Sequence, residues 1–151
     1  MRSPGELTEA FRARGLKVTP QRQAIFRILY DNGAHPTAEA VYEHVRAEMP
    51  TVSLRTVYAI LGELVEMGEL QQLDLGTGAA RFDPNQTGHH HLVCERCGKV
   101  RDLQADFGPL KVPTRQRQGF VVDTAEIVFR GLCAECASDQ ADQPRGEDRH
   151  V

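Results

Sequence analysis

The fold is decided by two segments, HHHLVCERCG at residues 89–98 and CAEC at residues 133–136. Each contains a Cys-x-x-Cys knuckle, which bends the backbone so that two thiolates converge on one metal ion. Two knuckles complete a tetrahedron, and its ligands would be Cys94, Cys97, Cys133 and Cys136. Four sulfur ligands leave no open coordination position, so the pattern predicts a closed structural zinc site rather than a catalytic one. The alternatives are separate redox motifs or free thiols.

The rest of the composition fits a small cytoplasmic chain. The 151 residues contain no apolar run that predicts a signal peptide or a membrane span, and four cysteines without such a signal favour a reducing compartment. Aromatic residues make up only 6% of the chain, so neither core can be rich in aromatic packing. If 151 residues form two lobes, each is near the size at which a metal or a dimer partner contributes to folding. The net charge of −3 gives no signal for nucleic acid, but residues 2–27 are locally basic.

The N-terminal half has the start and stop signals of four helices. We expect the first over residues 6–14, closed by Gly15, and the second from Pro20, with Thr19 as N-cap, to the Asn32-Gly33 stop. The third is expected from Pro36-Thr37 to Glu48, and the fourth over residues 53–67 with Ser53 as N-cap. A loosely alternating stretch over residues 70–82 predicts a hairpin. Three core helices followed by a hairpin is the order of a winged helix-turn-helix, whose third core helix lies in the DNA major groove. The alternative is an ordinary small helical domain.

A polar, turn-rich segment at residues 83–88 predicts a hinge. Beyond it we expect strands over residues 89–94 and 99–103, a helix interrupted by prolines over residues 107–117, and a β-rich stretch over residues 120–129. The predicted fold class is α+β, with an N-terminal winged-helix domain at residues 1–82 and a C-terminal α/β metal-sensing and dimerisation domain at residues 89–137 that carries the four-cysteine zinc site. The polar tail at residues 138–151 is expected to be disordered.

A second metal site is indicated by three consecutive histidines. On a strand, His89 and His91 share one face and His90 takes the other. Two imidazoles on one face suit a divalent metal, and the carboxylates Asp83 and Asp102 flank the segment. Nitrogen and oxygen ligands without a thiolate favour Fe(II) or Mn(II) over zinc. Alternatively, these aspartates are ordinary surface residues.

Several blocks of the chain together resemble the ferric uptake regulator superfamily. They are GLKVTPQR at residues 15–22, HPTA at 35–38, SLRTVY at 53–58, RFD at 81–83, HHHLVCERCG at 89–98 and CAEC at 133–136. Within the superfamily the chain is most similar to the peroxide-sensing repressors. The resemblance implies a regulatory Fe(II) or Mn(II) site formed by His35, Asp83, His89, His91 and Asp102, beside the structural zinc. Iron-uptake members typically have Glu at the position of Asp83, and zinc-uptake members usually add a thiolate to this site.

The resemblance also implies a DNA-binding surface. It assigns Tyr58, on the recognition helix, to a base or methyl contact and Lys17 to a minor-groove or phosphate contact. Arg22, Arg55 and Thr56 lie near helix starts, where basic side chains and backbone amides meet phosphate. Because Tyr58 falls on the apolar stripe of its helix, core packing is the alternative for this residue.

The sequence therefore predicts a metal-dependent DNA-binding transcriptional repressor rather than an enzyme. Its expected partners are a palindromic double-stranded operator and a second copy of the chain, with no membrane and no small molecule beyond the metal and hydrogen peroxide. Peroxide would act through Fe(II)-catalysed oxidation of a ligand histidine, either His35 or His89, with loss of metal and derepression. The alternatives are an iron- or manganese-uptake regulator that responds only to metal level and, from another class, a metalloenzyme, for which no nucleophile–base pair is evident.

Overall fold

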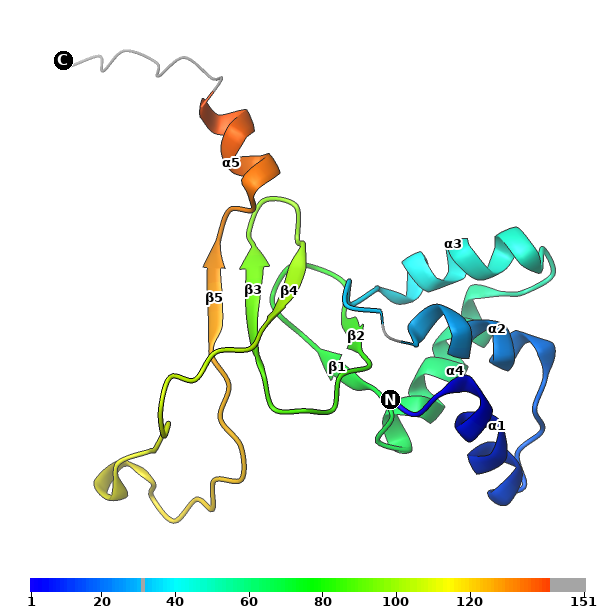
Figure 1. Cartoon of the computed structure of the whole chain (residues 1–151), viewed down its shortest axis with the longest axis horizontal. Helices are drawn as coiled ribbons and strands as arrows, with labels where there is room; N and C mark the ends of the chain where they lie inside the picture. Colours follow the sequence, from blue (N-terminus) through cyan, green and yellow to red (C-terminus); the bar gives the residue numbers. More distant parts are fainter. Residues whose placement is uncertain (31, 142–151) are drawn as a thin grey trace. The chain divides into compact units, whose positions relative to one another are not determined.

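The computed structural model describes residues 1–30 and 32–141, which fall into two compact units divided between Gly88 and His89. Within the described part of the first unit there are four helices (Figure 1): α1 (Pro4–Ala13), α2 (Pro20–Leu29), α3 (Ala38–Glu48) and α4 (Leu54–Glu66). Each begins at a hydroxyl N-cap that accepts the N–H three residues later; the caps are Ser3, Thr19, Thr37 and Ser53. Local capping chemistry therefore sets where these helices start.

The helices enclose one hydrophobic core. Its buried members come from all four helices and, outside them, from Val52, Leu70 and Phe82. The rings of Phe11 and Phe26 are in contact, with their centroids 5.0 Å apart. Helix α4 contributes Val57, Ile60, Leu61 and Leu64, which are spaced so that they share one face. Tyr58 lies outside this face and is 47% exposed, so the core alternative for this tyrosine is wrong.

A two-stranded wing follows α4. Strands β1 (Gln71–Leu73) and β2 (Arg81–Asp83) pair antiparallel, with Gln72 opposite Phe82. The turn between them contains Gly76 and Gly78, both with positive φ, a conformation that glycine adopts without strain. Three core helices followed by this hairpin confirm the predicted winged helix-turn-helix.

Among the described residues, the second unit is a small three-stranded sheet with one α-helix (Figure 1). Strand β3 (His90–Cys94) lies in the centre, antiparallel to β4 (Val100–Leu103) and parallel to β5 (Val128–Gly131). Helix α5 (Ala134–Ala141) follows β5. The predicted α+β fold, with four cysteines positioned to hold zinc, is confirmed.

Two elements differ from expectation. The helix predicted over residues 107–117 is reduced to a single 3-10 turn, Thr114–Gln116, because Pro109 and Pro113 remove helical donors and restrict the residues before them. The β-rich stretch over residues 120–129 forms a strand only from Val128. Phe120 is 74% exposed and Val121 is 87% exposed, and β-propensity without a partner strand does not make a sheet.

The structure also differs from the predicted positions of the hinge and of the C-terminal tail. The segment expected to be a hinge belongs to the first unit, where Asp83 ends β2 and the Gln86 side chain donates to the Glu69 carbonyl at 3.2 Å. The first residues of the tail expected from residue 138 instead belong to helix α5. This helix starts directly at the second knuckle, where the Ala137 N–H donates to the Cys133 carbonyl. Residues 142–151, which hold the rest of that tail, lie outside the described residues. In the described part of the chain, no helix has the length and hydropathy to cross a membrane.

Candidate metal centres and DNA-binding face

The four cysteines converge within the second unit. Cys94 ends β3, Cys97 lies in the turn that follows, and Cys133 and Cys136 flank the start of α5. All four Sγ atoms lie within 4.8 Å of one another, and Cys97 Sγ is 3.8 Å from Cys133 Sγ. Sulfurs about 2.3 Å from a tetrahedral zinc ion are themselves about 3.8 Å apart. The cluster therefore has the dimensions of a closed zinc site with four sulfur ligands.

The backbone of the first knuckle shapes this cluster. Gly98 has φ +71° and its N–H donates to Cys94 O at 2.9 Å, which closes the turn. Hydrogen bonds from the backbone of Cys97 and Cys133 lower the pKa of the Cys94 thiol to about 6. Burial raises the pKa of the Cys136 thiol to about 12. Burial therefore opposes ionisation within this cluster, an effect that a bound cation would offset.

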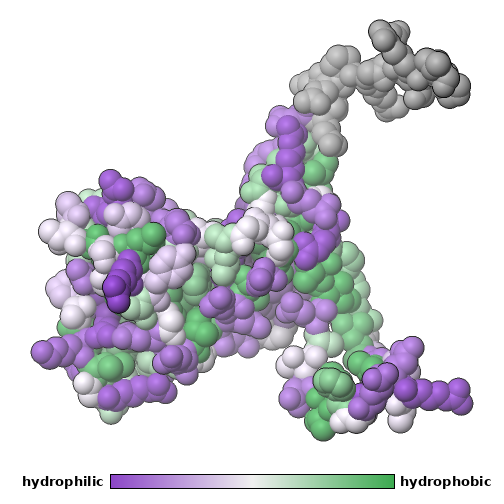
Figure 2. Space-filling view, turned by 180° about the vertical axis from the view of Figure 1, so that it is seen from behind, coloured by the Kyte–Doolittle hydropathy of each residue, from purple (hydrophilic) through white to green (hydrophobic). Residues whose placement is uncertain are grey.

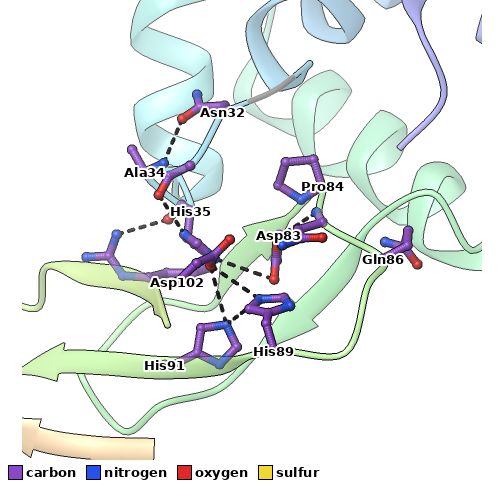
Figure 3. A network of polar contacts seen from close by, with 12 residues as sticks. Asn32, Ala34, His35, Asp83, Pro84, Gln86, His89, His91 and Asp102 are labelled. Atoms are coloured by element: carbon purple, nitrogen blue, oxygen red, sulfur yellow. Dashed lines mark hydrogen bonds and ion pairs between the residues drawn. The ribbon is translucent and has the colours of Figure 1, made fainter. Parts of the chain in front are cut away.

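In the first unit, His35 and Asp83 form a buried pair (Figure 3). His35 Nε2 lies 3.4 Å from Asp83 Oδ2, and both side chains are fully buried. His35 Nδ1 is 3.0 Å from Gly33 O, so an Nδ1–H donated to this carbonyl puts the lone pair on Nε2, the atom that faces Asp83. The His35 backbone has φ +49°, and its carbonyl accepts from Arg81 Nη1 at 3.0 Å. Strand β2 therefore both supplies the carboxylate and holds the histidine loop.

In the second unit, His89, His91 and Asp102 converge on one face of the sheet (Figure 3). His89 Nε2 lies 3.1 Å from His91 Nε2 and 3.2 Å from Asp102 Oδ1, and the remaining distance, from His91 Nε2 to Asp102 Oδ1, is 3.9 Å. The antiparallel register explains the placement, because His91 is directly opposite Asp102 on β4. His90 Nδ1 instead accepts the Ile127 N–H at 3.0 Å, so His90 is held apart from this group.

These distances fit metal coordination. Two nitrogen or oxygen ligands about 2.1 Å from an ion, at angles near 90–109°, lie about 3.0–3.4 Å apart. The His35–Asp83, His89–His91 and His89–Asp102 distances fall within or near this range. Both groups lack sulfur, so their chemistry suits Fe(II) or Mn(II). Two histidines and one carboxylate, as in the second unit, are also the ligand set of non-haem Fe(II) sites that react with oxygen species.

Helix α4 presents a polar face to solvent. Arg55, Tyr58, Ala59 and Gly62 are exposed at i, i+3, i+4 and i+7, opposite the buried stripe. Thr56 is half-buried and its hydroxyl lies 2.9 Å from Ser53 Oγ at the helix start. Lys17 is exposed in the segment before α2. Four of the residues expected to meet DNA therefore lie at or near the surface of the winged-helix unit.

Arg22 is the exception, because its guanidinium is used within the protein. Its Nη2 lies 2.6 Å from Glu63 Oε1 and its Nε lies 3.2 Å from Glu63 Oε2, a bidentate pair between α2 and α4. Its Nη1 donates to the Lys17 carbonyl. Arg22 thus positions α4 and the Lys17 segment. Sequence reasoning missed Glu63, which is 41 positions away and carries no local signal for this contact.

The comparisons with known proteins agree with this architecture. The model of the ferric uptake regulator family matches residues 13–129. The peroxide-responsive repressor PerR of Staphylococcus aureus (strain Mu50 / ATCC 700699) is 33% identical over 132 residues, 87% of this chain and 89% of that protein. The ferric uptake regulator Fur of Helicobacter pylori has a similar structure, with a TM-score of 0.71 at 22% identity over 88% of this chain and 90% of that chain. PerR from Streptococcus pyogenes gives a TM-score of 0.53 at 25% identity, over 90% of this chain and 94% of that chain.

A family match over most of the chain, a curated relative above 30% identity and the cysteine and histidine clusters all lead to one assignment. The chain belongs to the ferric uptake regulator family and is a metal-responsive DNA-binding repressor, as its sequence predicts.

Proposed function

We propose that this repressor senses hydrogen peroxide through one divalent ion held by ligands from both units. His35 and Asp83 would come from the first unit, and His89, His91 and Asp102 from the second. The main support comes from the second unit, which by itself offers two imidazoles and a carboxylate. Their Nε2 and Oδ1 atoms are 3.1, 3.2 and 3.9 Å apart. This is the donor set that Fe(II) uses where it reacts with oxygen species.

Oxidation of one of the ligand histidines by peroxide would lower the affinity of the site for its metal. Ferrous iron bound at this site supplies the chemistry by which peroxide oxidises a ligand imidazole, at His35 or His89. The ring gains one oxygen atom and the other oxygen of peroxide leaves as water. His35 is held in a left-handed backbone conformation by Arg81 and its ring is oriented by Gly33. An oxidised ring kept in this position no longer offers the same nitrogen lone pair to the metal.

Metal would control DNA binding by selecting one arrangement of the two units. Ligands on both units can hold a single ion only when the units face each other suitably, and an ion shifts the population by its difference in affinity between arrangements. That arrangement would set the separation of two α4 helices in a dimer, and so match two half-sites of a palindromic operator.

A homodimer is supported by the edge of the second unit. Strand β5 is an outer strand of the described sheet, and Leu92, Phe129 and Leu132 are each at least 40% exposed beside it. Figure 2 shows hydrophobic surface over this part of the unit. An outer strand edge beside exposed apolar side chains is typical of a subunit interface.

The test compares the Fe(II) and Mn(II) forms before and after a stoichiometric pulse of hydrogen peroxide. We expect both forms to bind operator DNA, and only the iron form to lose binding, with a gain of one oxygen atom on the peptide that contains His35 or His89. His89→Ala should abolish metal-dependent binding, whereas His44→Ala, an exposed histidine of α3, should not. Equal persistence of both metal forms after peroxide would instead identify an uptake regulator, and repeated turnover of peroxide would identify an enzyme.

A further inference from the structure

A carboxylate of α3 stands against the exposed tyrosine of α4. Tyr58 Oη donates a hydrogen bond of 2.7 Å to Glu39 Oε1, although the two residues are 19 positions apart. Both residues are exposed, and Tyr58 lies on the solvent face of α4 beside Arg55 and Ala59. The pair therefore lies on the surface that we propose meets the major groove.

The phenol is the donor of this hydrogen bond and the Glu39 carboxylate is its acceptor. Hydrogen bonds from the Tyr58 hydroxyl, from the backbone of Glu39 itself and from the Thr37 side chain lower the pKa of the Glu39 carboxyl. The same contact with Glu39 raises the pKa of the Tyr58 phenol. At neutral pH Glu39 is thus an ionised acceptor, and the single phenolic proton of Tyr58 is engaged by it.

A tyrosine whose proton is engaged has only its oxygen lone pairs left to offer to DNA. In the major groove, adenine N6 and cytosine N4 are donors, whereas guanine N7 and O6 and thymine O4 are acceptors. The Tyr58 oxygen can therefore pair with adenine N6 or cytosine N4, whereas opposite guanine N7 or O6 or thymine O4 it meets another acceptor. A contact of the Tyr58 ring with a thymine methyl does not involve the hydroxyl and is independent of this hydrogen bond.

We propose that Glu39 is a specificity-determining residue, which fixes the Tyr58 hydroxyl as a hydrogen-bond acceptor and so favours adenine or cytosine at the base that this hydroxyl meets. This inference rests on the proposed contact of α4 with DNA. Glu39 also places a negative charge near phosphate, which weakens binding to every sequence alike and in a salt-dependent way. The two effects are separable, because only the hydrogen bond depends on the base.

The experiment selects from a randomised palindromic DNA library with the full-length, metal-loaded protein. We expect Glu39→Ala to reduce the preference for adenine or cytosine at one position of each half-site by about fivefold, the value of one net hydrogen bond. Tyr58→Phe should reduce the preference at the same position, and the double variant should show no further loss. Glu39→Gln keeps an acceptor for the Tyr58 proton and should retain most of the preference. Glu43→Ala, an exposed acid of α3 whose side chain bonds to Arg46, is the matched control for charge.

The outcomes distinguish this inference from the function on which it rests. If wild-type protein selects a palindrome and Glu39→Ala selects the same one with uniformly altered affinity, Glu39 acts only through its charge and the inference is wrong. Additive losses in the double variant would overturn it equally. If wild-type protein enriches no sequence in either metal form, the proposed function fails and the inference fails with it. Melting curves of the variants should overlay that of wild type, because both side chains are exposed.

Discussion

Removal of zinc from the cysteine cluster is expected to unfold the second unit and leave the first unit folded. The hydrophobic core cluster belongs entirely to the first unit. Among the described residues of the second unit, the buried aliphatic side chains are Val93 and Val100. Burial of one valine contributes about 1.5–3 kcal/mol, so the two together contribute about 3–6 kcal/mol. A structural zinc ion contributes about 10–16 kcal/mol, and so dominates the stability of this unit.

Hydrogen exchange measured by mass spectrometry checks this expectation unit by unit. After chelation with verified loss of zinc, peptides covering β3 and β5 should exchange as unfolded chain, while peptides covering α2 and α4 keep their protection. Re-addition of zinc should restore the protection of β3 and β5, which serves as the control for irreversible damage. Cys97→Ser should reproduce the chelated state.

Protection of β3 and β5 that survives complete loss of zinc would refute this reasoning. It would mean that packing outside the cysteine cluster holds the second unit together. Loss of protection in α2 and α4 at the same time would contradict the independence of the two units.

Three further predictions concern the first unit. Hydrogen bonds from the Ser3 side chain and backbone lower the pKa of Glu6 from 4.5, so the stabilisation from Glu6 is present above pH 4.5 and is lost as the pH falls through the lowered pKa. Urea denaturation of wild type and Glu6→Gln should therefore differ at neutral pH and converge in acid; a difference that persists in acid would exclude the charge as its origin. Gly62→Ala should raise the stability by about 1 kcal/mol, because a Cβ there meets no atom within 4 Å on helix α4; a lower Tm would contradict this. Arg22→Lys should cost about 1–3 kcal/mol, since lysine cannot pair with both Glu63 oxygens; an unchanged denaturation midpoint would show that the bidentate contact is not needed.

The sequence alone determined the features that depend on neighbouring residues. Helix starts at Thr19, Thr37 and Ser53 follow from a hydroxyl that caps an N–H three residues later. The zinc ligands follow from two knuckles whose spacing is itself the geometric requirement. The pairing of His89 with His91 follows from the alternation of a strand. In each case the physical constraint acts over a few residues, so the pattern is complete in the sequence.

Only the tertiary structure decided which distant side chains meet. Packing of α2 and α3 against α4 brings Arg22 to Glu63 and Glu39 to Tyr58, pairs separated by 41 and 19 positions. The same packing gives an arginine expected to bind phosphate an internal role instead. The β-rich stretch expected from residue 120 forms a strand only from Val128, because a strand needs a partner that its own residues do not specify. Non-local contacts depend on which helix faces and strand edges come together, and that information is spread over the whole fold.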